Sequence, residues 1–158
     1  MSRFLTQARR HVTEPLSIME YNPIWATIFA EEATRIKTRC KDRVIAIDHI
    51  GSTSVPGLAS KAIIDIAVLV KNWRFMPGVF ENMDDLGYTY KGDCGRPGSE
   101  YFTRIGFHMH LSRYDSPQYL IKLVFIEYLK NNRQALDEYA ELKRMLVKKW
   151  SEKPNEVT

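Results

Sequence analysis

Two apolar segments joined by a short loop limit the folds that this chain can adopt. Residues 44–50 have the composition of a buried strand, and residues 63–70 (Ile-Ile-Asp-Ile-Ala-Val-Leu-Val) are apolar on both faces, as a central strand requires. The intervening residues 51–60 are rich in Gly, Ser and Pro, which predicts a loop with one helical turn. The chain must therefore build a sheet around a strand–turn–strand unit.

A single acid, Asp65, interrupts the second strand. Burying a bare carboxylate costs on the order of several kcal/mol, so Asp65 must be paired, protonated or bound to a metal ion. Glycine at position 51 lets the backbone approach a ligand closely, and the hydroxyls of Ser52, Thr53 and Ser54 could hold phosphate oxygens. The same pattern also fits a plain turn followed by an acid that accepts backbone hydrogen bonds. Chemistry alone leaves both interpretations open.

The flanking patterns predict a mixed α+β domain. Helices with a 3.6-residue period are expected at 23–40, 77–86, 116–130 and 134–150. Further strands are expected at 88–91, 100–105 and 107–112. In the last helix, five side chains are expected to contact the core: Leu136, Tyr139, Leu142, Leu146 and Trp150. We expect one domain over residues 1–158, in which residues 1–20 form an N-terminal arm.

Composition excludes several classes of protein. A chain of 158 residues with 44% hydrophobic residues can form a core without disulfides. Its two cysteines, Cys40 and Cys94, match no metal-ligand spacing. This use of cysteine favours a reduced, cytoplasmic setting. Neither an apolar run of about 18 residues nor a signal peptide is present, so no membrane association is expected. The basic residues that give the net charge of +4 are spread along the chain and mixed with acidic residues, which argues against a nucleic-acid partner. Nothing in the sequence indicates an oligomeric state.

The run HIGSTSVPGLASKAIID at residues 49–65 is similar to the signature of the GrpB family, whose domain also occurs fused to bacterial dephospho-coenzyme A kinases. Shorter motifs between residues 15 and 150 also resemble that family: Tyr21-Asn-Pro-Ile-Trp25, Gly95-Arg-Pro-Gly98, Tyr101-Phe102, Met109-His110-Leu111, Phe125-Ile-Glu-Tyr-Leu-Lys130 and Tyr139-Ala-Glu-Leu-Lys143. The resemblance implies a nucleotidyltransferase-like α+β fold with a small mixed sheet flanked by helices. In active members of that superfamily, a Gly-Ser turn holds the triphosphate and paired acids bind Mg²⁺.

This resemblance, together with the strand pattern, defines a set of candidate site residues. Asp65 is the leading catalytic and Mg²⁺-binding candidate, and His110, which matches the family's His strand, is the second. Candidates for binding phosphate or substrate are His49, Gly51, Ser52, Thr53, Ser54, Lys61, Arg104, Tyr139 and Lys143. Arg96 is a further cation expected near the pocket.

The chain departs from the active pattern of the superfamily. Ala67 stands where the second acid is expected, and an alanine cannot bind Mg²⁺. Ser99 and Glu100 replace a pair of arginines, and Ile126 replaces another arginine. We therefore expect binding of a nucleotide or another phosphorylated small molecule, with weak or absent nucleotidyl transfer.

Two alternatives remain open. The first is a catalytically degenerate module that only binds. The second is a metal-dependent hydrolase in which Asp65 acts with His108 and His110, which alternate on one strand and so face the same side. Catalytic transfer would need another acid to point at Asp65, and the candidates are Asp48, Asp93 and Glu100.

Overall fold

The computed structural model of this chain describes residues 17–152, apart from residues 73, 75, 94, 96 and 97. Residues 1–16 of the expected arm therefore lie outside the described part. In chain order the elements are α2 (Ile24–Cys40), β1 (Val44–Ile50), β2 (Ile64–Val70), α3 (Met76–Asp85), β3 (Thr89–Gly92), β4 (Ser99–Arg104), β5 (Phe107–Arg113), α4 (Pro117–Asn131) and α5 (Arg133–Glu152), with a short 3₁₀ turn at Ser52–Ser54. Each expected helix and strand is confirmed, with bounds that differ by at most two residues.

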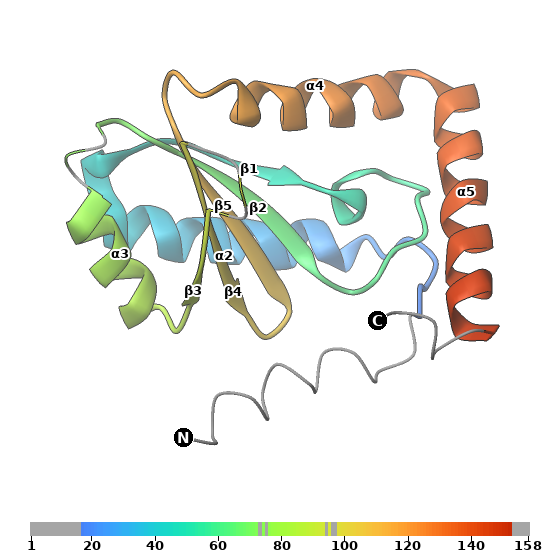
Figure 1. The fold of residues 1–158 in the computed structure, drawn as a ribbon, viewed down its shortest axis with the longest axis horizontal. Coiled ribbons are helices and arrows are strands. Elements are labelled where there is room, and N and C mark those ends of the chain that lie inside the picture. Colours follow the sequence, from blue (N-terminus) through green and yellow to red (C-terminus); the bar gives the residue numbers. More distant parts are fainter. Residues whose placement is uncertain (1–16, 73, 75, 94, 96–97, 153–158) are drawn as a thin grey trace.

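The five strands form one sheet in the order β1-β2-β5-β4-β3. β2 pairs in parallel with β5, and the other neighbouring strands are antiparallel. β2 is flanked by strands on both edges and by helices on both faces, which explains why its sequence is apolar throughout. The expected small mixed sheet flanked by helices is confirmed (Figure 1).

Helices cover the two faces of the sheet unequally. α2 and α3 pack on one face, where Ile36, Ile66 and Met83 belong to the larger core cluster. α4 packs on the opposite face over β1, β2 and β5, and the first half of α5 joins it there, where Ala67 and Ile126 belong to a smaller cluster. Figure 1 shows α5 turning away from α4 along one end of the sheet. On this second face, His108 and His110 of β5 stay partly exposed, whereas Ser112 at the far end of the same strand is buried.

The C-terminal half of α5 departs from the sequence expectation. Leu136 is buried as expected, but Leu142, Leu146 and Trp150 are 45%, 45% and 44% exposed, so their assignment to the core was wrong. A helical period identifies which residues share a face, but it does not say what that face meets. Here the last turns of the face meet a cavity instead of the core.

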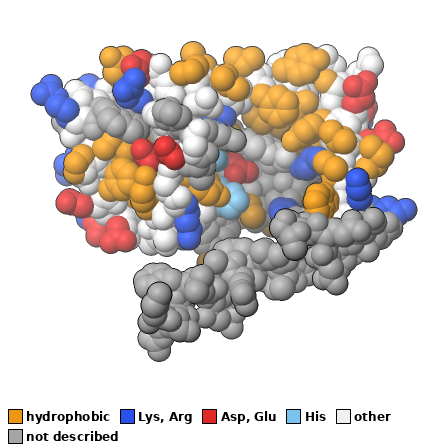
Figure 2. All heavy atoms as spheres, viewed as in Figure 1, with side chains coloured by type: hydrophobic (Ala, Val, Ile, Leu, Met, Phe, Trp, Pro, Cys, Tyr) orange, Lys and Arg blue, Asp and Glu red, His pale blue; other side chains and the backbone are white. Residues whose placement is uncertain are grey.

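The outer side of α4 is apolar as well as its inner side. Figure 2 shows hydrophobic side chains gathered along the edge of the molecule that α4 forms, and the exposed ones are Leu120, Ile121, Val124, Phe125 and Tyr128. None of the helices in the described part of the chain is both long and apolar enough to cross a membrane.

Candidate functional site

The Gly-Ser turn lies directly against Asp65. Gly51 follows the last residue of β1 and has φ 70° and ψ −176°, a backbone conformation that is essentially restricted to glycine. A Cβ atom at Gly51 would lie 2.3 Å from Asp65 Oδ2 and 2.8 Å from Asp65 Cβ. Ile50 is also the register partner of Asp65 across β1 and β2. Only a glycine therefore fits at position 51, where the chain leaves β1 directly beside the Asp65 carboxylate.

Two hydroxyls of the loop hold the turn itself. The Ser54 hydroxyl donates to the carbonyl oxygen of Gly51 at 2.7 Å. The buried Thr53 hydroxyl donates to the carbonyl oxygen of Ile63 at 3.1 Å, which ties the loop to the start of β2. These bonds occupy the hydroxyl protons of both residues, and neither residue lines the cavity described below.

His49 belongs to the packing beneath the loop. Its Nε2 lies 3.0 Å from the Thr53 hydroxyl oxygen. Because that hydroxyl already donates to Ile63, we infer that His49 Nε2 carries the proton. Burial lowers the pKa of His49 to about 4, although Asp65 acts in the opposite direction, and the imidazole stacks on the Phe29 ring at 4.7 Å. A neutral ring packed in this way supports the loop and does not line the cavity.

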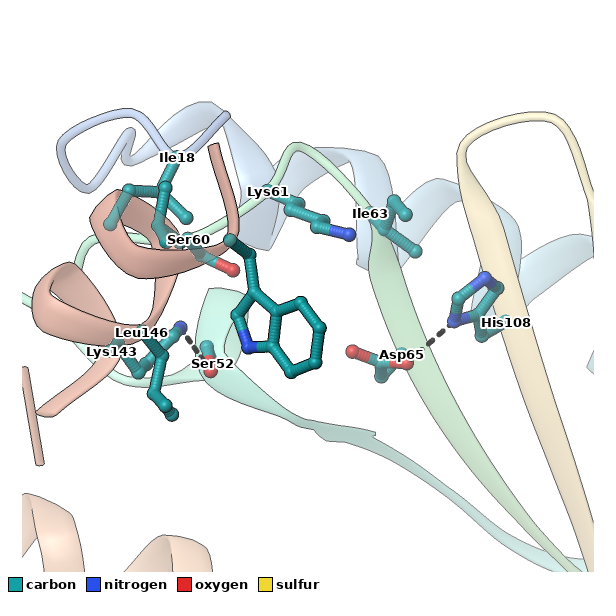
Figure 3. A pocket seen from close by; sticks show the side chains of 11 residues that line it. Ile18, Ser52, Ser60, Lys61, Ile63, Asp65, His108, Lys143 and Leu146 are labelled. Atoms are coloured by element: carbon teal, nitrogen blue, oxygen red, sulfur yellow. Dashed lines mark hydrogen bonds and ion pairs between the residues drawn. The ribbon is translucent and has the colours of Figure 1, made fainter. Parts of the chain in front are cut away.

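A cavity of about 340 Å³ lies between the loop, the start of β2 and α5. Its lining residues are Ile18, Ser52, Ser60, Lys61, Ile63, Asp65, His108, Lys143, Leu146, Val147 and Trp150. Figure 3 shows Ser52 with Lys143 on one side of this space and Asp65 with His108 on the other. The structure thus brings together four of the predicted site residues, which are Ser52, Lys61, Asp65 and Lys143.

Lys143 connects α5 to the Gly-Ser turn. Its Nζ donates to the Ser52 hydroxyl at 2.7 Å and to the carbonyl oxygen of Ala59 at 2.8 Å. Burial lowers the pKa of the Lys143 ammonium, and Asp65 acts in the opposite direction. The same ammonium lies 5.9 Å from the ring centre of Tyr139, which packs against the core and does not line the cavity.

The histidine beside Asp65 is His108. Its Nδ1 lies 3.3 Å from Asp65 Oδ1, because the parallel register of β2 and β5 sets these two residues side by side. The side chains are 27% exposed for Asp65 and 36% for His108, so both are accessible from the cavity. His110 is instead the register partner of Ala67, and its ring stacks on Tyr101 at 5.0 Å.

One of the three candidate acids shares a sheet face with Asp65. Asp48 is the register partner of Ala67, so its side chain stands beside the position where the second acid is missing. The Tyr119 hydroxyl donates to Asp48 Oδ2, and burial, together with this bond, raises the pKa of the phenol. The Asp48 carboxylate is therefore already engaged by a neutral phenol.

The other two candidate acids have partners elsewhere. Glu100 lies on the opposite face of the sheet, where its carboxylate accepts a hydrogen bond from the Tyr90 hydroxyl at 2.5 Å. Asp93 accepts a hydrogen bond from the backbone N–H of Gly95 at 2.9 Å. Among the described residues, no three His, Cys, Asp or Glu side chains gather as a group that could hold a metal ion. A Mg²⁺ ion at Asp65 would therefore need oxygens from a ligand and from water.

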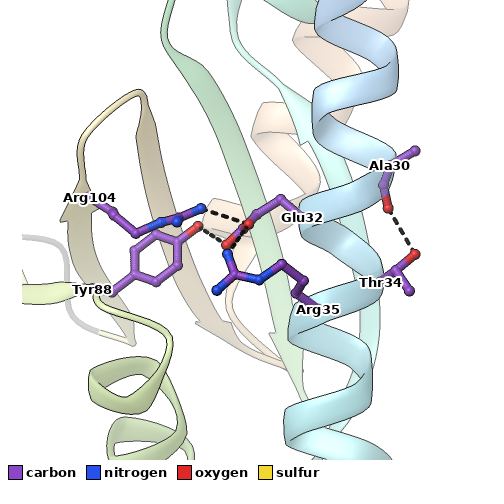
Figure 4. A network of polar contacts seen from close by, with 6 residues as sticks. All are labelled: Ala30, Glu32, Thr34, Arg35, Tyr88 and Arg104. Atoms are coloured by element: carbon purple, nitrogen blue, oxygen red, sulfur yellow. Dashed lines mark hydrogen bonds and ion pairs between the residues drawn. The ribbon is translucent and has the colours of Figure 1, made fainter.

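Arg104 lies in a separate polar network between the sheet and α2 (Figure 4). Its guanidinium forms an ion pair with the buried Glu32 at 2.6 Å, and the same carboxylate accepts a hydrogen bond from the Tyr88 hydroxyl at 2.9 Å. Arg35 also pairs with Glu32, at 2.6 Å. Arg104 thus neutralises a buried acid and does not line the cavity. Arg96 lies outside the described residues.

Of the cavity residues, Trp150 was expected in the core, and His108 was considered only for the hydrolase alternative. Trp150 lies seven residues after Lys143, which is about two helical turns, so the helical period alone would have placed both on one face. To place His108 beside Asp65, the register between β2 and β5 must be known. A parallel pairing between strands so far apart in sequence leaves no local signal.

Comparison with solved structures gives a strong similarity and several weak ones. The conserved protein GrpB from Enterococcus faecalis aligns with a TM-score of 0.79 at 34% identity, over 85% of this chain and 84% of that chain. A cytoplasmic RNA terminal U-transferase aligns with a TM-score of only 0.47 at 16% identity, over 84% of this chain and 41% of that chain. A similarity at that level supports no conclusion about ligand or reaction.

Sequence comparison identifies the family. UPF0157 protein YqkA of Bacillus subtilis is 38% identical over 84% of this chain and 40% of its own length. A dephospho-CoA kinase of Mycobacterium leprae is 24% identical over 86% of this chain and 41% of its own length, in line with the expected fusion. The chain thus spans less than half the length of these two relatives. Because the family model described as GrpB protein also matches residues 15–157, the chain belongs to the GrpB family.

Proposed function

We propose that this protein binds the phosphate groups of a small molecule, a nucleotide or a compound of similar size, in the cavity beside Ser52. The observation that carries the proposal is the hydrogen bond of 2.7 Å from Lys143 Nζ to the Ser52 hydroxyl, within a cavity that Lys61 also lines. An ammonium group has three donors, and a phosphate oxygen can accept from it in place of Ser52. The cavity volume of about 340 Å³ is within the range of small-molecule sites.

Asp65 faces the same cavity and is the residue that would hold Mg²⁺ against the bound phosphates. Mg²⁺ is commonly bound by one or two carboxylates together with phosphate oxygens and water, so one accessible carboxylate is sufficient for a bridging ion. When bound, the ion would neutralise phosphate charge. Asp65 would orient it, while Ser52 and Lys143 hold the phosphates from the other side of the cavity.

Efficient nucleotidyl transfer is not part of this proposal. Transfer depends on a fixed arrangement of charge around the phosphates. Ala67 supplies no second carboxylate, and the neighbouring Asp48 accepts a hydrogen bond from Tyr119. Ile126, which replaces an expected cation, is buried among apolar residues. A protein that binds nucleotides with weak or absent transfer fits these features best.

A metal-dependent hydrolase is the second candidate. The observation in its favour is the contact of 3.3 Å between Asp65 and His108, a carboxylate and an imidazole of the kind that bind transition metals. His110, the other histidine considered for this role, is the register partner of Ala67 and stacks on Tyr101. His108 is therefore the histidine that the hydrolase would use beside Asp65.

Isothermal titration calorimetry with Mg²⁺ and tripolyphosphate tests the proposal. The double variant Ser52→Ala with Lys61→Ala should weaken binding by about 1–3 kcal/mol, or about 5- to 150-fold, because charge-assisted hydrogen bonds are lost. Lys148→Ala is the matched control, because Lys148 is an exposed lysine of α5 that does not line the cavity. Equal affinity in the double variant and the wild type would locate the phosphate site elsewhere.

A further inference from the structure

The cavity beside Ser52 has two chemically different parts. One part carries the hydroxyl and ammonium groups of Ser52, Lys61 and Lys143, and the other is lined by Leu146 and Trp150 from the last turns of α5. Leu146 is 45% exposed and Trp150 is 44% exposed. Apolar side chains that stay half open to water inside a cavity, next to convergent polar groups, are the usual lining of a ligand site.

The position of Trp150 on α5 lets one ligand contact both kinds of lining. Lys143 and Trp150 are seven residues apart, so they lie on one face of the helix, and their Cα atoms are separated by about 10.5 Å along its axis. Inorganic phosphate held at Lys143 has no ring that could pack against the indole of Trp150. A nucleotide carries a flat base joined to its phosphate chain through a ribose, so it offers a phosphate to Lys143 and a ring face to Trp150.

We propose that Trp150 stacks on the base of a nucleoside phosphate whose phosphate chain lies at Ser52 and Lys143. This inference rests on the proposed function and names the class of ligand for the same cavity. An indole face stacks on any base, because every base has a π face. The volume of about 340 Å³ is at the lower end for ligand sites, which suits one mononucleotide better than a lipid or a polymer.

Calorimetry with three ligands, each at the same Mg²⁺ concentration, tests the stacking. The wild-type protein should bind ATP and UTP at least about fivefold more tightly than tripolyphosphate, because stacking on an aromatic ring adds to the affinity. Trp150→Ala should remove this difference and leave the affinity for tripolyphosphate unchanged. Trp150→Phe, which keeps an aromatic face, should retain most of it. Met145→Ala is the control, because Met145 is 57% exposed on the same helix and does not line the cavity.

The outcomes separate this inference from the proposed function. If tripolyphosphate binds as tightly as both nucleotides, the stacking is refuted and the phosphate site stands. If Trp150→Ala weakens tripolyphosphate and nucleotides by the same factor, Trp150 positions α5 and does not contact a base, which also refutes the stacking. If the wild-type protein binds none of the three ligands, both proposals fail.

Discussion

At the residue scale, both the backbone conformation at position 51 and the contact with Asp65 require a glycine. Gly51→Ala should lower the free energy of unfolding by about 2–3 kcal/mol, because the new residue adopts a glycine-only conformation and its Cβ meets Asp65 at 2.3 Å. Gly57→Ala is the control: Gly57 has φ 83° but open space around the added Cβ, so it should lose only about 1 kcal/mol. Denaturant unfolding measures both values, and equal losses would mean that the contact with Asp65 carries no cost.

His49 makes stability depend on pH in a defined direction. Its pKa is about 4 in the folded protein, chiefly because of burial, and about 6.5 in an unfolded chain. The unfolded chain therefore binds a proton that the folded chain does not, and the stability contributed by neutral His49 is complete above pH 6.5 and is lost as pH falls towards 4. Denaturant titrations between pH 7 and pH 4 should show a shallower decline for His49→Gln. An unchanged decline would mean that other groups cause the pH dependence.

Asp65 decides between the proposed binding protein and an active transferase. Incubation with Mg²⁺ or Mn²⁺, a nucleoside triphosphate and candidate acceptors should release little or no pyrophosphate, because Ala67 leaves one carboxylate facing the phosphates. Rapid release that disappears in Asp65→Asn would contradict this expectation and show that another acid completes the site. Rapid release that persists in Asp65→Asn would point to a different reaction centre, for which His108 is the first candidate.

At the element scale, the two sides of α4 should respond differently to truncation. Ile126 is 4% exposed, and Ile126→Ala should cost about 2–4 kcal/mol of unfolding free energy because it opens a cavity in the smaller core cluster. Val124 is 66% exposed two residues away, so Val124→Ala should change the same quantity by less than about 0.5 kcal/mol. Thermal or denaturant unfolding checks both, and a large loss in Val124→Ala would mean that the outer side of α4 is covered.

The helices and strands could be predicted from the sequence, whereas the contacts between them could not. Apolar periods locate each helix and strand, and the turn glycine with the lone acid locates Asp65, because these signals are local. Pairing is not local: the approach of His108 to Asp65 depends on a parallel register between β2 and β5. The assignment of Trp150 to the core failed for a related reason, since its helical period is correct but the surface that it meets belongs to other segments.

At the scale of the whole molecule, the cavity forms only where the loop after β1 meets the last helix, α5. Ser52 and Lys143 are 91 positions apart in the chain, and their hydrogen bond joins the loop after β1 to the last helix. A ligand held by both segments should therefore stabilise the folded protein, by about 2.7 kcal/mol at a concentration of 100 times its Kd. Thermal unfolding with and without Mg²⁺ and ATP measures this, and no shift in melting temperature at saturation would mean that the ligand does not bind the folded state preferentially.

An amide NMR titration of the full chain with Mg²⁺ and ATP tests whether the ligand binds in this cavity. The proposed site predicts that chemical-shift changes concentrate at Ser52, at Lys61 and at the cavity-lining residues of α5 from Lys143 to Trp150. Changes confined to the opposite face of the sheet, such as the network of Glu32 and Arg104, would contradict it. The absence of any change at saturating nucleotide would contradict it equally.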